Sequence, residues 1–377
     1  MEKTAPFTPP TKVEILAALK TPPTEKCGVH DRAFDALEGL PCHCPIAAPK
    51  RGEWLQDHKE IPQSFAKYIA GKNTSKVTAM RNKIYIMPLE ASVTDSFLEL
   101  LCKFSNIFYP GVMATTMKAM SLDDPKFQSK VTSRVNEWVG KKQYLTKDIL
   151  NLMAPLLPQD ALNLMGCLNT DLFPNENWNY VFGWGRSDIK CGVFSFARFS
   201  ETFFDPDAKE DPQLLEYKAL RIMVHEMGHT FNIGHCTFHN CGMNGMNHAE
   251  ELMAKPIEFC LVCLKKLQYC LGFDPIKRFE GLRAFCLESK NPHVTKLAQY
   301  YESALAVLAQ QSKPTPLTQA PKMTASSTPM QKAVLPKPQP ATKPQITSKP
   351  SVTQTTKVQL KPAVATLGKV TSPTLKK

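Results

Sequence analysis

The 377-residue sequence predicts a three-layer α/β domain in the middle of the chain. The run at 191–199 is rich in aromatic and β-branched residues, as strands are, and the segments at 83–89 and 162–173 are also expected to be strands. Apolar residues recur at helical spacing between and after these runs. Strands that alternate with helices indicate a sheet covered by helices, and a domain of roughly 200 residues is large enough to bury its own core.

The expected elements fall into three parts of the chain. An N-terminal extension, at 1–80, carries two short amphipathic helices, at 11–20 and 54–69. The domain itself, at 81–311, is expected to contain, in order, a strand at 83–89, helices at 93–108 and 145–153, strands at 162–173 and 191–199, and helices at 214–231, from near Pro256, and at 294–308. A tail at 312–377 follows.

The helix at 214–231 has the clearest limits. Asp211 can cap its N-terminus, Pro212 suits its first turn, and no proline interrupts the segment. The helix is expected to end between Asn232 and Gly234, because both residue types tolerate the left-handed backbone conformation that terminates helices.

This helix carries His225, Glu226 and His229, and His235 follows it, which gives the pattern H-E-x-x-H-x5-H. Side chains four residues apart on a helix lie roughly 5–6 Å apart, so His225 and His229 can bind one zinc ion. His235 becomes a third ligand if the chain doubles back. Glu226 faces the same cavity without being a ligand, which suits a general base that activates zinc-bound water. The alternative is that the motif arose by chance.

Four cysteines follow the third histidine in the pattern C-x4-C, an eighteen-residue spacer, and C-x2-C. They are Cys236, Cys241, Cys260 and Cys263. This spacing suits a closed, structural zinc site with four thiolate ligands. Four buried free thiols, or two disulfides, are the alternatives.

The string HEMGHTFNIGHCTFHNCGM and the later CLVC resemble the archaemetzincin signature, and a looser likeness extends from about Lys83 to Phe285. The resemblance implies a metzincin-like three-layer domain with a mixed twisted sheet. It implies a catalytic zinc on the three histidines, Glu226 as the general base, a structural zinc on the four cysteines, and aminopeptidase-like hydrolysis of short peptides. Met243 would be the Met-turn residue beneath the site, although it could equally fill a gap in the core.

Asn232 departs from the metzincin pattern, which usually has glycine at this position. Asparagine is common in the left-handed region for a non-glycine residue, so the turn is expected to be kept at some cost in stability.

The strand at 191–199 is a candidate for the edge strand nearest the cleft, which in metzincin-like folds can pair with an extended peptide. An ordinary internal strand is the alternative. Arg198 could meet a substrate carboxylate or form a surface salt bridge. Acidic residues that could meet a substrate amine, or else be solvated surface groups, are Glu201, Asp205, Glu250 and Glu251.

The tail has a composition of its own. From residue 313 onward, 65 residues include 11 Lys and 11 Pro and no acidic or aromatic residue, so the segment is predicted to be disordered. It accounts for 11 of the net charge of +12 and leaves 35 basic and 34 acidic residues before it. The tail is expected to be a solvated spacer; weak binding to a polyanion is the alternative.

Neither a secretory signal nor an apolar run of 18 residues is found, which predicts an intracellular protein, cytoplasmic or nuclear, without a membrane span. The twelve cysteines are then expected to be thiols or zinc ligands. A third metal site, or a latency ligand, from Cys27, Cys42, His43 and Cys44 is disfavoured by their spacing, and these cysteines are expected to be free thiols.

Taken together, the residues favour a zinc metallopeptidase with two zinc ions that acts on peptides. The alternative is a zinc-stabilised interaction module that has lost efficient hydrolysis. A nucleic-acid-associated protein is disfavoured, because the chain before the tail is nearly neutral.

Overall fold

The computed structural model describes residues 6–22, 33–34, 37 and 44–311. The predicted disordered tail lies outside the described residues, as do Cys27, Cys42 and His43, so the predictions made for them stay predictions. No helix within the described ranges is both long and apolar enough to cross a membrane.

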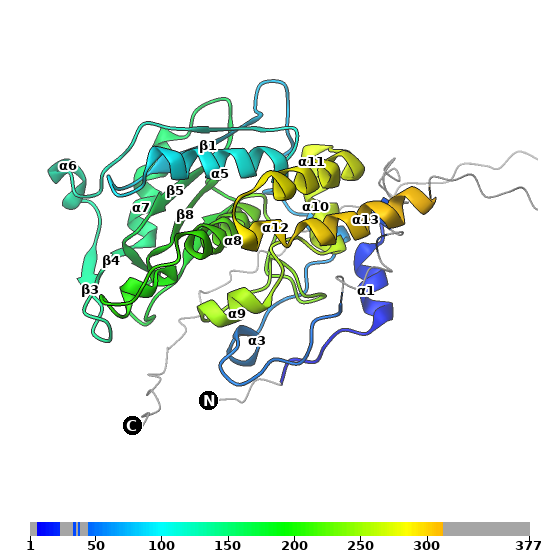
Figure 1. Ribbon diagram of the computed structural model, residues 1–377, viewed down its shortest axis with the longest axis horizontal. Coiled ribbons are helices and arrows are strands. Elements are labelled where there is room, and N and C mark those ends of the chain that lie inside the picture. Colours follow the sequence, from blue (N-terminus) through cyan, green and yellow to red (C-terminus); the bar gives the residue numbers. More distant parts are fainter. Residues whose placement is uncertain (1–5, 23–32, 35–36, 38–43, 312–377) are drawn as a thin grey trace, which may run out of the picture. The chain divides into compact units, whose positions relative to one another are not determined.

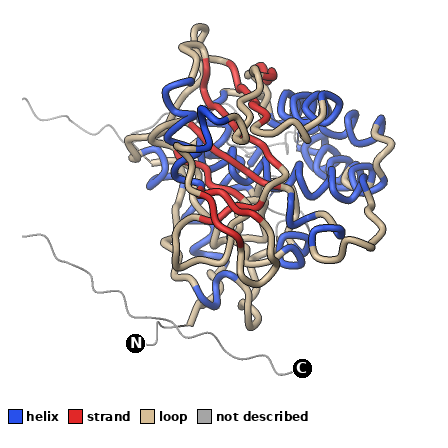
Figure 2. Tube along the Cα trace, turned by 90° about the vertical axis from the view of Figure 1, so that its left-hand side faces the viewer, coloured by secondary structure: helices blue, strands red, loops and turns tan. Residues whose placement is uncertain are grey.

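A five-stranded sheet in the order β2-β1-β5-β8-β7 forms the centre of the domain (Figure 2). Its strands are β1 (Lys83–Pro88), β2 (Met113–Thr116), β5 (Ala161–Leu168), β7 (Gly183–Arg186) and β8 (Cys191–Ser195). The first four strands in the sheet order are parallel, and only β7 runs antiparallel, to β8. The sheet is therefore mixed, and β7 is one of its two edges.

Of the two alternatives for 191–199, the internal strand is confirmed and the edge strand is wrong. β8 lies between β5 and β7, and all five of its residues are buried, as expected for an internal strand. The extended backbone also stops at Ser195, and a 3-10 turn, η2 (Ala197–Phe199), follows. The apolar composition of this segment therefore reflects burial on both faces of the sheet.

A second, smaller sheet is formed by β3 (Ser133–Val135), β4 (Lys142–Leu145) and β6 (Asp171–Phe173). The strand expected at 162–173 is divided between the two sheets, because β5 ends at Leu168 and β6 begins at Asp171. Asn169 lies at the break, where its backbone N–H donates a hydrogen bond to the Glu90 carboxylate at 2.8 Å instead of continuing the ladder.

Helices cover both faces of the central sheet, which confirms the three-layer prediction. α5 (Asp95–Phe108) and α8 (Pro212–Thr230) pack on one face, and α7 (Thr146–Met153) packs on the other. β8 shows the division, because Phe194 belongs to the core beneath α8 whereas Val193 belongs to the core beneath α7. The remaining short helical elements of this part of the chain are α6 (Pro125–Gln128), η1 (Ala154–Leu156) and η3 (Glu201–Phe203).

The C-terminal part adds five helices, α9 (Ala249–Ala254), α10 (Leu261–Leu271), α11 (Pro275–Glu288), α12 (Pro292–Thr295) and α13 (Ala298–Gln311). α11, which the sequence did not predict, packs against α5 and α13 (Figure 1). The helix expected from near Pro256 begins later, at Leu261, because the backbone before it pairs with the loop at Gly242. The helix expected at 294–308 is divided into α12 and α13.

The N-terminal extension contains α1 (Lys12–Leu19), α3 (Trp54–Asp57) and α4 (Phe65–Ile69). The single helix expected at 54–69 is wrong, since an extended stretch containing Pro62 separates α3 from α4, and Ser64 caps α4. We call residues 44–69 the N-terminal strap. It pairs with the loop after α8, where the backbone N–H of Ile46 donates to the carbonyl of Phe238 at 3.1 Å, and α3 lies beside α9 (Figure 1).

Candidate metal centre and active-site cleft

Helix α8 positions the first part of the site. The Asp211 carboxylate accepts hydrogen bonds from the backbone N–H groups of Gln213 and Leu214, and Pro212 occupies the first turn, as predicted. Most of the helix from Tyr217 to Thr230 is buried, so its histidines emerge from a helix that is fixed by packing on nearly all sides.

The end of α8 is a Schellman turn built on Asn232. Its φ is 68°, and its backbone N–H donates to the carbonyl of His229 at 2.9 Å, while that of Ile233 donates to Gly228 at 3.1 Å. The Ser187 hydroxyl also donates to the Asn232 side-chain oxygen at 3.1 Å. Asn232 therefore takes the left-handed conformation that the sequence predicted, and the reversal of the chain brings His235 back toward the helix.

The three histidines converge at one point. Ring centroids are 4.7 Å apart for His225 and His229, 5.3 Å for His225 and His235, and 4.9 Å for His229 and His235. One nitrogen from each ring lies within 4.8 Å of the others. The structure thus brings together the three imidazoles that the spacing had grouped.

Hydrogen bonds at Nδ1 fix which ring nitrogens carry protons. His225 Nδ1 lies 2.8 Å from the carbonyl oxygen of Gly242, and His229 Nδ1 lies 2.8 Å from that of Ile233. A carbonyl oxygen only accepts, so both Nδ1 atoms donate and both Nε2 atoms carry lone pairs. Burial lowers the pKa of His229 to about 3 and that of His225 well below its usual value, so both rings are neutral at pH 7.

This arrangement fits a cation. The Nε2 atoms of His225 and His229 are 3.1 Å apart, and neither has a proton to share with the other. Two lone pairs that face each other at this distance repel unless a positive charge lies between them. A set of three neutral imidazoles is a typical ligand set for catalytic zinc, with one coordination position left open. The residues present therefore fit the zinc ion that the sequence predicted.

Glu226 lies next to this cluster but outside it. Its carboxylate accepts a hydrogen bond from the backbone N–H of Gly185 at 2.8 Å, and burial raises its pKa to about 8 despite that bond. β7 approaches α8 closely here, because a Cβ on Gly183 would lie 2.6 Å from Glu226 Cγ and one on Gly185 would lie 2.1 Å from the Glu226 carbonyl oxygen. Glycine at both positions lets the edge strand β7 lie directly on the turn of α8 that carries Glu226.

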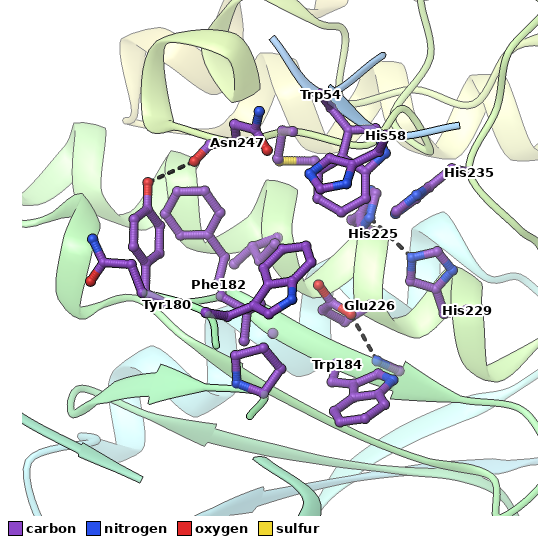
Figure 3. Close-up of a pocket in the computed structure, with 18 of the residues that line it drawn as sticks. Trp54, His58, Tyr180, Phe182, Trp184, His225, Glu226, His229, His235 and Asn247 are labelled. Carbon is purple, nitrogen blue, oxygen red and sulfur yellow. Dashed lines mark hydrogen bonds between the residues drawn. The ribbon is translucent and has the colours of Figure 1, made fainter. Parts of the chain in front are cut away.

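A cavity of about 780 Å³ opens beside the histidines. Its aromatic wall includes Trp54, His58, Trp178, Tyr180 and Trp184, and Glu226 faces into it (Figure 3). Trp54 and His58 lie near His235, while Trp184 of β7 lies on the other side of Glu226 (Figure 3). Burial lowers the pKa of His58, which stacks on Trp178 with a centroid distance of 5.2 Å.

The sequence did not predict the part of the site that comes from the N-terminal strap. Glu60 Oε1 lies 2.6 Å from His235 Nδ1 and accepts a hydrogen bond from the Trp54 indole at 2.7 Å. Burial acts to raise the pKa of Glu60, but the hydrogen bonds from His235 and Trp54, together with the electrostatic influence of His235, hold that pKa below its usual value. No spacing pattern connects residue 60 with residue 235, so only the folded chain reveals this contact.

The four cysteines form a second cluster, and all four are buried. The Sγ atoms of Cys236 and Cys260 are 3.5 Å apart, so these two do not form a disulfide. Backbone N–H groups of Met243 and Cys260 point at Cys241 Sγ, at 3.4 and 3.1 Å. Hydrogen bonds from the other three cysteines hold the pKa of Cys236 well below its usual value, while burial raises that of Cys241 and Cys260. Four convergent sulfurs with no exposed side fit a structural zinc ion.

Met243 lies between the two clusters. It is fully buried, and a Cβ on Gly228 would lie 2.3 Å from its sulfur, so the side chain packs against the helical turn between His225 and His229. Its carbonyl accepts a hydrogen bond from the backbone N–H of Cys236 at 2.7 Å. The structure therefore places Met243 beneath the histidines, where the resemblance located it.

The remaining candidates do not reach the cavity. The salt bridge expected of Arg198 is present but buried instead of on the surface, since its guanidinium forms a two-pronged ion pair with Asp171 at 2.9 and 2.8 Å and does not face the cavity. Glu251 is not a solvated group either, since its buried carboxylate accepts hydrogen bonds from the backbone N–H groups of Trp54 and Asn247. Glu201, Asp205 and Glu250 are surface groups, and none of them lines the cavity that the described residues form.

Comparison with known proteins places this site in a family. The model of peptidase family M54 matches residues 163–269, which include all seven proposed ligands and Glu226. Archaemetzincin-2 of Rattus norvegicus is 26% identical over 266 residues, which cover 63% of this chain and 73% of that protein. Archaemetzincin-1 of Homo sapiens is 29% identical over 267 residues, covering 63% of this chain and 53% of that protein. The crystal structure of archaemetzincin from Methanopyrus kandleri is 22% identical and covers 52% of this chain and 99% of that one, with a TM-score of 0.40.

A helix-borne histidine pair, a third histidine after a tight turn and an adjacent glutamate define a metzincin-type zinc metallopeptidase. Over residues 163–269 the chain matches peptidase family M54, and the relatives that it resembles over 266 and 267 residues are archaemetzincins.

Proposed function

We propose that the protein is an aminopeptidase-like zinc metallopeptidase in which Glu226 is the general base and the three histidines hold the catalytic metal. A zinc ion bound there would supply Lewis-acid activation of a water molecule and of the scissile carbonyl. Glu226 would take the proton from the attacking water and deliver it to the departing amine nitrogen. Its carboxylate is held in place for both transfers by the backbone N–H of Gly185.

β7 is proposed to align the substrate. Ser195 donates to the carbonyl of Phe182, so residues 182 and 184 face β8, while Gly183 and Gly185 direct their backbone groups to the open side of the strand. The bond from Gly185 to Glu226 fits this alternation. An extended peptide could therefore pair with the outer edge of β7 and bring its carbonyl next to Glu226.

The observation that supports cleavage near the N-terminus is the one-sided shape of the cleft. The last residue of β7 that lines the cavity is Gly185, and the other lining residues of this segment lie at 174–184. Tyr180, Phe182 and Asn247 all lie on one side of the histidines (Figure 3). A peptide antiparallel to β7 would extend its C-terminal part into this cavity.

Beyond Gly185, the chain on the opposite side of the histidines is tied to neighbouring segments of the protein. Ser187 is hydrogen-bonded to Asn232, and Gly71 packs so closely on Asn232 that a Cβ there would lie 3.0 Å from its side-chain nitrogen. Lys190 donates to the carbonyl of Asn73 at the same end. Little chain could extend beyond the scissile bond on its N-terminal side, which supports release of a short N-terminal fragment or a single residue.

A distorted turn at Asn232 or the lack of a defined substrate pocket would favour the alternative of an inactive interaction module. Asn232 adopts the conformation that glycine would supply, and the cavity provides a pocket. No feature of the described site favours the module over the enzyme.

A matched peptide series tests the aminopeptidase proposal. The same octapeptide would be offered with a free N-terminus, with an acetylated N-terminus and with an amidated C-terminus, and products would be identified by mass spectrometry. We expect the free and C-amidated peptides to lose N-terminal residues and the acetylated peptide to be cleaved at least about tenfold more slowly. Glu226→Gln should cleave all three about 10²–10⁴-fold more slowly than wild type. Equal internal cleavage of all three peptides would rule out the N-terminal preference while leaving the peptidase intact.

A further inference from the structure

We propose that Glu60 is a positioning residue for the metal centre, so that the N-terminal strap is a built-in part of the active site. The proposal rests on the proposed function only for the location of the metal on His225, His229 and His235. Residue 60 lies about a hundred residues before the segment that the family model matches, at 163–269.

The contact between Glu60 and His235 has a defined direction. Glu60 Oε1 lies 2.6 Å from His235 Nδ1 and 2.7 Å from Nε1 of Trp54. An indole N–H can only donate, so Oε1 is an acceptor, and an ionised carboxylate can likewise only accept from the imidazole. His235 Nδ1 is therefore the donor, so Nε2 is the nitrogen of this ring that can offer a lone pair to a metal ion held with the other two histidines.

His235 needs such a partner more than the other two ligands do. His225 and His229 lie on a buried helix, and each donates its Nδ1–H to a main-chain carbonyl within the 225–242 segment. His235 lies on the loop after the helix, and the acceptor that orients its ring is a side chain 175 residues earlier in the chain. Carboxylates and carbonyls in this position fix the tautomer and the ring orientation of a ligating histidine and raise its basicity.

The strap is anchored on both sides of Glu60 by contacts that do not involve His235. Before it, the backbone N–H of Trp54 donates to the buried carboxylate of Glu251 at 3.1 Å. After it, the Gln63 side chain bridges the turn at the end of α8, donating to the carbonyl of Asn232 at 2.9 Å and accepting from the N–H of Gly234 at 3.0 Å. Glu60 is thus held from both directions, and the second anchor also holds the turn that leads to His235.

The aromatic side chains of the strap shield this hydrogen bond from water. The Trp54 ring lies edge-on to His235 with a centroid distance of 5.0 Å, and it packs on His58 at 3.9 Å. The side chains of His235 and Glu60 are 20% and 21% exposed. A charge-assisted hydrogen bond in such a partly dry place is stronger than one at an open surface.

Zinc affinity of the full-length protein tests the proposal. Zinc content and dissociation constants would be measured by competition with a chromogenic chelator for wild type, Glu60→Ala and Glu60→Gln, with the cysteine-bound zinc as an internal reference. Loss of such a histidine partner typically weakens metal binding about 10–100-fold. We therefore expect Glu60→Ala to weaken zinc binding at the histidine site by that factor and to leave zinc binding at the cysteine site unchanged. Glu60→Gln should weaken zinc binding at the histidine site less, because its amide oxygen still accepts from His235 Nδ1.

Glu53→Ala is the matched control. Glu53 is a carboxylate on the same strap, and it accepts from the backbone N–H of Lys50 at 2.8 Å without reaching a histidine. We expect the Glu53→Ala protein to bind both zinc ions with wild-type affinity. Three outcomes would each overturn the proposal. Glu60→Ala could bind zinc with wild-type affinity, Glu53→Ala could lose as much zinc affinity as Glu60→Ala, or the wild-type protein could bind only the zinc ion held by the cysteines. Loss of N-terminal preference with normal zinc binding would count against the proposed function alone.

Discussion

The last ligand of the histidine site, His235, is followed directly by the first ligand of the cysteine site, Cys236, and yet the two candidate metal sites differ in their construction. The histidine site has three imidazoles on the wall of a cavity, with the Glu226 carboxylate beside them. The cysteine site has four buried sulfurs and backbone N–H groups directed at one of them. An open coordination position allows chemistry, whereas a closed four-thiolate site contributes only to folding.

Their adjacency shows how the second site serves the first. The cysteine cluster connects the loop after α8 to the start of α10, at Cys260 and Cys263, and so it fixes the backbone that carries His235. Met243, buried between the two sites, fills the space beneath the helical turn. We expect damage to the cysteine site to affect the whole domain, and damage to the histidine site to affect only catalysis.

The largest effect is expected from Cys263→Ala. Structural zinc contributes about 10–16 kcal/mol of folding free energy in small zinc domains, which is comparable to the roughly 5–15 kcal/mol stability of an ordinary domain. The variant should lose one zinc ion and fail to show a cooperative thermal transition. His229→Ala should lose the other zinc ion and stay folded. A Cys263→Ala protein that melts near the wild-type temperature would contradict the division between the two sites.

The pH dependence of stability tests the histidine site separately from the cysteine site. Without metal in the open site, burial raises the pKa of Glu226 from 4.5 to about 8. Between these values the folded protein holds a proton that the unfolded chain has released, so this residue's contribution to stability falls as pH rises from 4.5 to 8. Each pKa unit corresponds to about 1.4 kcal/mol, so the contribution of Glu226 to the free energy of unfolding falls by on the order of 5 kcal/mol over this range.

The Glu226→Gln variant has no ionisable group at this position, so it is the reference for measuring how the free energy of unfolding depends on pH. Unfolding free energies of both proteins would be compared from pH 4.5 to 9 after a mild chelator has stripped the open site but not the cysteine site. Wild type should lose stability relative to Glu226→Gln as pH rises, and zinc should abolish the difference, because a nearby dication favours the ionised carboxylate. Parallel pH curves for the metal-free proteins would show that Glu226 is not buried as described.

The smallest effect is expected at Asn232. Alanine tolerates the left-handed conformation less well than asparagine and cannot accept from Ser187, so Asn232→Ala should cost about 1–2 kcal/mol. Asn232→Gly loses the same hydrogen bond but gains conformational freedom, and it should lie within about 1 kcal/mol of wild type. Chemical denaturation measures both, and equal losses for the two variants would remove the backbone conformation as the cause.

The sequence predicted those parts of the site that lie close together along the chain. The helix with its Asp211 cap, the turn at Asn232 and the two ligand clusters all follow from local spacing, and the structure shows each of them in place. Helical periodicity and residue composition also predicted the three-layer architecture.

What the sequence could not predict depends on contacts between distant segments. Glu60 reaches His235 across 175 residues, and composition alone could not show that β7, with two glycines in GWGR, is the edge strand instead of the apolar β8. Arg198 and Glu251 were predicted from charge as surface groups, because their buried partners, Asp171 and the backbone of Trp54, lie far away in sequence.

Zinc content and peptide hydrolysis in Glu226→Gln test the central claim most directly. Because Glu226 lies beside the metal ligands without being one, the variant should bind two zinc ions per chain as wild type does, while hydrolysis falls by about 10²–10⁴-fold. Undiminished hydrolysis with full zinc content would contradict the role of Glu226, and a wild-type protein with fewer than two bound zinc ions would contradict the two-site account.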